Sequence, residues 1–120
     1  MKNHPTNTYL ITGATSGIGL TLVEQLLDQG MNVIGIGRSR ERCRQQSKRL
    51  RKEYPGQNLD YCLADLSKQA EIRAAVGEIT EILEHWGIPT LDGLVNNAGT
   101  FTYWQTITPE GFDTQWAVNH

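Results

Sequence analysis

The 120-residue sequence has few of the features that mark secreted, metal-binding and membrane-spanning proteins. Its two cysteines, Cys43 and Cys62, form no C-x-x-C pair, and the polar stretch from Met1 to Thr8 does not resemble a signal peptide. Both thiols are therefore expected to be reduced, with no metal site. No apolar run approaches the roughly 20 residues that cross a bilayer, so a cytoplasmic location without a membrane segment is expected.

The sequence also has almost no excess of positive or negative charge. The formal net charge of −2 gives no overall attraction to nucleic acid or to anionic membranes. An apolar content of 38% is enough for one packed core, and the length suits one domain. Residues 1–120 are therefore expected to form a single domain.

Short apolar runs alternate with segments of helical periodicity along the chain. Strands are expected over residues 9–11, 32–36, 59–63 and 91–95. Helices are expected over residues 18–29, 39–54, 68–87 with Ser67 as the cap, and from Thr108 to His120. This alternation favours right-handed βαβ units and a parallel sheet covered on both faces. The expected fold class is α/β, a truncated Rossmann-type doubly wound sheet of strand order 3-2-1-4, with its ligand crevice between the first and fourth strands.

A glycine-rich turn separates the first strand from the first helix. Gly13 permits a tight turn, Gly17 lets a pyrophosphate approach the backbone, and Gly19 lets the helix pack closely against the strand. The helix N-terminus adds N–H donors and partial positive charge. The candidate phosphate-binding residues are Gly13, Thr15, Ser16, Gly17, Ile18 and Gly19.

The same glycine turn has two other interpretations. An isolated glycine trio can form an ordinary turn, although its place between a strand and a helix favours phosphate binding. A nucleotide triphosphatase P-loop is disfavoured because Ile18 and Gly19 stand where that motif needs its lysine.

The residues after the second strand bear on cofactor choice. An NAD-preferring site places a carboxylate there to bind the ribose 2′-hydroxyl, whereas this sequence has Arg38 and Ser39. A guanidinium binds a 2′-phosphate through charge-assisted hydrogen bonds, so these residues predict that NADP(H) is preferred over NAD(H). Arg40 is a weaker candidate for the same role.

Eight of the eleven basic residues lie between Arg38 and Lys52. A nucleic-acid surface is one interpretation of this cluster. A solvated helix face is favoured because the segment lacks interleaved aromatic residues and the whole chain is slightly acidic. No nucleic-acid partner is therefore expected.

Four motifs in order resemble the short-chain dehydrogenase/reductase family. They are Thr12-Gly13-x-x-x-Gly17-Ile18-Gly19, Asp65-Leu66, Asn96-Asn97-Ala98-Gly99 and Val118-Asn119-His120. The resemblance runs from Tyr9 to His120 and covers the N-terminal half of a typical member. Residues 106–112 and 118–120 also resemble the retinol-dehydrogenase-like branch, which implies a small, lipophilic carbonyl or alcohol substrate.

The resemblance implies roles for several of these residues. Asp65 would contact the adenine ring with help from the Leu66 amide, and Asn97, Ala98 and Gly99 would line the ribose and phosphates. Asn119 matches an asparagine that keeps a water in place for the proton relay. From the residues alone, Asp65 is equally a helix-entry residue, and the asparagine pair equally binds neighbouring backbone.

Hydride transfer in this family also needs a tyrosine followed four residues later by a lysine. No tyrosine of this sequence has that partner, so the chain is expected to be inactive alone. The alternative is a catalytically silent dinucleotide-binding or interaction module. A fourth strand at the edge of the sheet would expose Leu91, Leu94 and Val95, which predicts self-association.

Overall fold

The computed structural model describes residues 7–97 and 117–118. Its strands are β1 (Thr8–Thr12), β2 (Asn32–Gly37), β3 (Leu59–Leu63), β4 (Gly93–Val95) and β5 (Ala117–Val118). Its helices are α1 (Gly17–Asp28), α2 (Arg40–Glu53) and α3 (Gln69–Trp86). The first four strands and first three helices were all predicted, with shifts of one or two residues at their ends.

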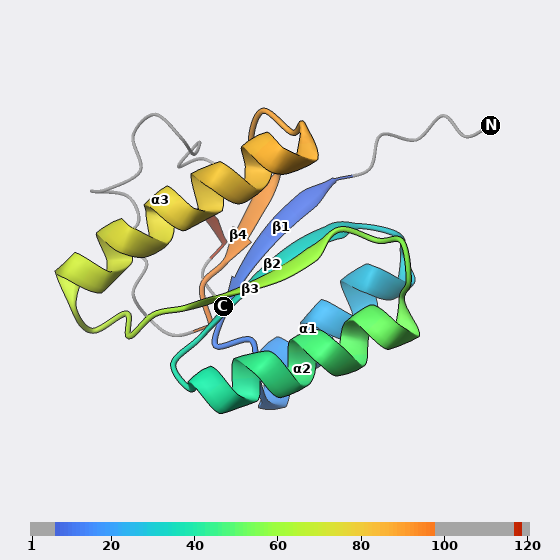
Figure 1. The fold of residues 1–120 in the computed structure, drawn as a ribbon, viewed down its shortest axis with the longest axis horizontal. Helices are drawn as coiled ribbons and strands as arrows, with labels where there is room; N and C mark the ends of the chain where they lie inside the picture. Colours follow the sequence, from blue (N-terminus) through green and yellow to red (C-terminus); the bar gives the residue numbers. More distant parts are fainter. Residues whose placement is uncertain (1–6, 98–116, 119–120) are drawn as a thin grey trace.

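The strands lie parallel in one sheet of order β3-β2-β1-β4-β5, which confirms the predicted order of the first four. Helices α1 and α2 cover one face and α3 covers the other (Figure 1). Side chains of the central strands alternate between the two cores. Leu10 and Ile34 pack with the α3 face, whereas Ile11 and Val33 pack with α1 and α2. Burial on both faces explains why β1 and β2 read as nearly continuous apolar runs.

The segment after β4 differs from the prediction. Ala117 and Val118 were expected inside a helix, but they form β5, which pairs in parallel with Leu94 and Val95 of β4. A neighbouring strand gives the edge of β4 hydrogen-bond partners that a helix could not supply. The remainder of the expected helix lies outside the described residues.

Strand β4 is consequently not a bare edge. Leu91 is 1% exposed and Leu94 is 7% exposed, because α3 packs against both. The prediction of solvent exposure is therefore wrong for Leu91 and Leu94, while Val95 is half-buried. The described residues do not show the exposed apolar edge from which self-association was predicted. Among the described residues, none of the helices has the length and hydrophobicity to span a membrane.

Two smaller predictions about helix starts are also wrong. Ile18 was placed on the apolar stripe of α1, but the buried residues of this helix are Gly19, Val23 and Leu27, and Ile18 is 79% exposed. Ser67 was predicted to cap α3, but the N-cap is Lys68. Ser67 instead donates its main-chain N–H and its hydroxyl to Asp65, a local side-chain turn that competes with capping.

A chain of polar side chains crosses the sheet at the amino ends of the strands. Asn58 donates to Asn32 Oδ1 at 3.2 Å, and Asn32 donates to Thr8 Oγ1 at 2.9 Å. The Thr8 N–H donates to Asp92 at 2.7 Å. The chain therefore joins β3, β2, β1 and β4 in their spatial order at the end opposite the cleft described below.

Asn32→Ala is expected to lower the free energy of unfolding by about 1–3 kcal/mol, because it leaves the buried Thr8 hydroxyl without its donor. Denaturant unfolding followed by circular dichroism measures this. Gln45→Ala, at an exposed position of α2, is the control and is expected to change stability by less than about 0.5 kcal/mol. Equal stability of the two variants would contradict the role given to the chain.

Candidate functional site

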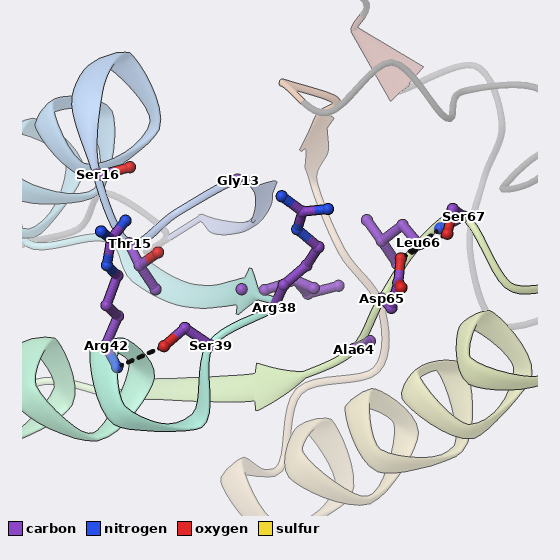
Figure 2. Close-up of a pocket in the computed structure, with 12 residues that line it drawn as sticks. Gly13, Thr15, Ser16, Arg38, Ser39, Arg42, Ala64, Asp65, Leu66 and Ser67 are labelled. Carbon is purple, nitrogen blue, oxygen red and sulfur yellow. Dashed lines mark hydrogen bonds between the residues drawn. The ribbon is translucent and has the colours of Figure 1, made fainter.

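A cleft of about 580 Å³ lies at the carboxyl ends of β1, β2 and β3. One wall is the turn after β1, with Gly13, Thr15 and Ser16, and the other walls follow β2 and β3 (Figure 2). Because β1 pairs with both β2 and β4, the cleft begins beside the position where the chain order of the sheet reverses. Ligands of open α/β sheets bind at this position.

The turn after β1 requires glycine for two different reasons. Gly13 and Gly17 have φ angles of 61° and 58°, in the left-handed region that favours glycine. Gly19 has an ordinary φ, but a Cβ there would collide with the Gly13 carbonyl oxygen. Gly19 therefore lets α1 begin against the end of β1, as its position in the sequence predicted.

The surroundings of Gly17 suit a ligand that approaches the backbone. A Cβ at Gly17 would meet nothing within 4 Å, so its surface is open. Ser16 is the N-cap of α1, and its side chain makes no capping bond, which leaves the hydroxyl available. The first turn of α1 carries no acidic residue that would repel an anion.

The second wall is basic and comes from the end of β2 and the start of α2. In Figure 2 the Arg38 side chain extends into the cleft between the Gly13 turn and Asp65-Leu66. Ser39 is the N-cap of α2 and accepts from the Arg42 N–H at 3.2 Å. The Arg42 side chain extends toward the side of the cleft that holds Thr15.

Arg42 is a cleft residue that the sequence reasoning missed. Arg40 was the secondary candidate, but it lies on a separate groove beside β3, together with Arg44 and Lys48. A signal for Arg42 was present, because it lies in the first turn of the helix that begins after Ser39, and the N–H of a residue three positions after an N-cap serine is a usual partner of that serine. Arg38 and Arg42 form no ion pair with any described carboxylate, so both charges are available to an anion.

The two walls are held close together by small residues. A Cβ at Gly37 would lie 2.6 Å from the Thr15 methyl and 2.9 Å from Cys43 Sγ. The glycine at the end of β2 therefore lets the turn after β1 pack directly against α2. A larger residue at this position would push Thr15 away from the basic wall.

Asp65 and Leu66 form the third side of the cleft, after β3. The Asp65 carboxylate accepts from the Ser67 hydroxyl at 2.7 Å and from the Ser67 N–H at 3.0 Å. These bonds, with smaller contributions from Lys68 and Arg38, hold the pKa of Asp65 below its usual value. Asp65 is thus a fixed carboxylate facing Arg38, while the Leu66 side chain is buried in the core on the α3 side.

The two asparagines after β4 stabilise the turn from behind. Asn96 is 1% exposed and accepts from the Thr12 hydroxyl at 3.2 Å. The Asn97 side-chain amide donates to the Gly13 carbonyl at 3.5 Å. Both side chains therefore connect β4 to the end of β1. The predicted site residues Ala98, Gly99 and Asn119 lie outside the described residues.

A parallel sheet with helices on both faces, a glycine turn after its first strand and a cleft at the switch point together define a Rossmann-type fold. A family model described as short chain dehydrogenase matches residues 7–120, and the chain belongs to this family. The resemblance inferred from the sequence motifs is confirmed.

Individual relatives agree with this assignment. The short chain dehydrogenase/reductase dpchH of Colletotrichum higginsianum is 38% identical over 92% of this chain and 27% of the relative. Retinol dehydrogenase 13 of Homo sapiens is 33% identical over 97% of this chain and 34% of the relative. The chain thus spans about a third or less of the length of these curated relatives.

Solved structures give the same fold. An NADPH-bound short chain oxidoreductase from Pseudomonas aeruginosa PAO1 superposes with a TM-score of 0.69 at 33% identity. The match covers 79% of this chain and 37% of that structure.

Proposed function

We propose that this chain binds NADP(H) and forms the cofactor-binding part of an oxidoreductase that transfers hydride between the cofactor and a carbonyl or alcohol. The observation that carries the proposal is the cleft itself, which is lined on one side by the glycine turn at Gly13, Thr15 and Ser16 and on another by Arg38 and Arg42, neither of which pairs with a described carboxylate. When bound, the nicotinamide cofactor supplies the hydride.

The glycine turn would hold the diphosphate. The N-terminus of α1 offers main-chain N–H groups, and Thr15 and Ser16 add hydroxyl donors at the cleft surface. Ile18 and Gly19 complete the turn by starting the helix at this place. In this arrangement Gly17, whose missing side chain leaves its backbone accessible, would be among the residues that hold the diphosphate.

Arg38 and Ser39 would hold the ribose 2′-phosphate, with Arg42 as a second cation. No carboxylate stands at the end of β2, where one would repel that phosphate. The Ser39 oxygen accepts from the Arg42 N–H, which leaves its own O–H free to donate to the phosphate. The NADPH-bound relative from Pseudomonas aeruginosa supports the same preference.

Other roles are carried over from the family resemblance. Asp65 and Leu66 would contact the adenine, Asn97, Ala98 and Gly99 would border the ribose and phosphates, and Asn119 would keep a proton-relay water in place. The adenine contact assigned to Asp65 is supported by the position of its carboxylate, which Ser67 holds across the cleft from Arg38. The retinol dehydrogenase among the relatives supports a lipophilic carbonyl or alcohol as the substrate.

Calorimetric titration with NADPH, NADH and 2′-phospho-ADP-ribose tests the proposal. NADPH and 2′-phospho-ADP-ribose are expected to bind with similar affinity, since both carry the phosphates that the cleft would hold. NADH is expected to bind at least about tenfold more weakly, because it lacks the 2′-phosphate and therefore loses roughly one charge-assisted hydrogen bond. Equal affinity for NADPH and NADH would contradict the assignment of Arg38.

The alternative function is a dinucleotide-binding module without catalysis, favoured by the absence of any Tyr-x-x-x-Lys in these 120 residues. We expect these residues to bind NADPH and to leave it unoxidised when a carbonyl such as retinal is added, because they contain no proton donor of that type. Absorbance at the nicotinamide band measures this. Steady oxidation that depends on the carbonyl would show that another residue supplies the proton.

A further inference from the structure

Tyr61 lies on β3, but its ring reaches across β2 to the turn after β1. It can do so because Gly35, its partner in the sheet register, has no side chain. A Cβ at Gly35 would lie 2.7 Å from the Tyr61 ring and 2.9 Å from the Ala14 Cβ. Gly35 does not have a positive φ, so the reason for glycine at this position is space for the ring.

The Tyr61 hydroxyl donates to the Ala14 carbonyl at 2.8 Å. On its other side, the Ala14 N–H donates to the Ile36 carbonyl at 3.0 Å. Ala14 is fully buried, and both of its main-chain polar groups are therefore fixed by neighbouring strands. Burial of the phenol raises the pKa of Tyr61, so the hydroxyl remains a donor at neutral pH.

This contact fixes the peptide that enters the phosphate-binding turn. In a trans peptide the C=O of one residue and the N–H of the next point in opposite directions. The Ala14 carbonyl points to the Tyr61 hydroxyl, so the Thr15 N–H points away from β3. Thr15 itself lines the cleft.

We propose that Tyr61 is a positioning residue for the cofactor diphosphate, acting through the Ala14 carbonyl to hold the Ala14–Thr15 peptide in its binding orientation. The inference rests on the proposed function, because it concerns the same cleft. It assigns a role to a residue of the edge strand β3, which lies outside the glycine motif and would act without touching the cofactor. Its partner is Gly35, which provides the space for the ring.

Tyr61→Phe tests the proposal, with Tyr54→Phe as the matched control. Tyr54 also donates through its hydroxyl, to Asp28 at 3.1 Å, but lies away from the turn. Tyr61→Phe is expected to weaken binding of NADPH and of 2′-phospho-ADP-ribose about fivefold, the effect of one ordinary hydrogen bond. Binding of adenosine 2′-monophosphate, which lacks the diphosphate, is expected to stay unchanged. Tyr54→Phe should change neither.

Gly35→Ala provides a second variant that keeps the hydroxyl. Its Cβ would displace the ring, so the same selective loss of diphosphate affinity is expected. Both variants break the same contact, the hydrogen bond from the Tyr61 hydroxyl to the Ala14 carbonyl. The double variant should therefore lose no more affinity than Gly35→Ala alone.

The outcomes are distinguishable. A wild-type chain that binds no NADPH overturns the proposed function itself. A wild-type chain that binds NADPH, beside a Tyr61→Phe variant with unchanged affinity, overturns the positioning role alone. Equal weakening of the diphosphate ligands and of adenosine 2′-monophosphate also overturns it, because a general loss of structure would affect every ligand.

Discussion

Arg38→Asp is expected to weaken NADPH binding by about 100-fold or more and to reverse the preference toward NADH. The substitution removes charge-assisted hydrogen bonds worth about 1.5–3 kcal/mol each and places a carboxylate against the 2′-phosphate. The same carboxylate can accept from the 2′-hydroxyl of NADH, so NADH affinity should rise or stay level. Calorimetry with both cofactors measures the change.

Arg73→Asp is the matched control for this experiment. Arg73 is exposed on α3, on the opposite face of the sheet from α2, and makes no ion pair with a described residue. The variant has the same net charge as Arg38→Asp, so it reports any effect of overall charge on an anionic ligand. If both variants lost NADPH affinity equally, the contact assigned to Arg38 would be refuted.

Gly19→Ala is expected to abolish measurable NADPH binding and to lower the free energy of unfolding by about 2 kcal/mol or more. The added Cβ would meet the Gly13 carbonyl oxygen, which is main chain and cannot move without shifting the turn or the helix. The same Cβ would lie 3.0 Å from the Asn97 amide that supports the turn. Thermal unfolding and calorimetry report the two effects.

Gly77→Ala makes the same change where the structure is open. Gly77 lies inside α3, and a Cβ there would meet nothing within 4 Å. This variant is expected to stabilise the protein by about 0.5–1 kcal/mol, because alanine favours a helix over glycine. A Gly19→Ala variant with wild-type stability and NADPH affinity would contradict the claim that the turn requires close packing of α1 against Gly13.

Several features of the site could be predicted because they depend on local sequence. Gly13, Gly17 and Gly19 stand between a short apolar strand and an amphipathic helix, and that context alone indicates their roles. Arg38 follows directly after β2, so its place at the carboxyl edge was fixed once the strand was recognised. Ser39 caps α2 at the predicted start of the polar segment.

The predictions that were wrong depended on contacts distant in sequence. Ala117 and Val118 follow a helix-like start signal, yet they pair with β4 more than twenty residues earlier. Ile18 fits a helical apolar spacing, but α1 packs on the sheet through Gly19, Val23 and Leu27, which leaves Ile18 in solvent. Tyr61 and Gly35 are unremarkable in the sequence, and only the register of β2 and β3 brings the ring over the glycine.

The sequence by itself determined the parallel α/β fold, the glycine turn and the basic residue that follows the second strand. Each of these depends on periodicity, backbone freedom or strand-to-helix order within a few neighbouring residues. The tertiary structure decided which side chains face the cleft and which hold the turn in place, including Arg42, Asn97 and Tyr61. Those positions depend on strand register and helix orientation, which only the packing of the whole sheet fixes.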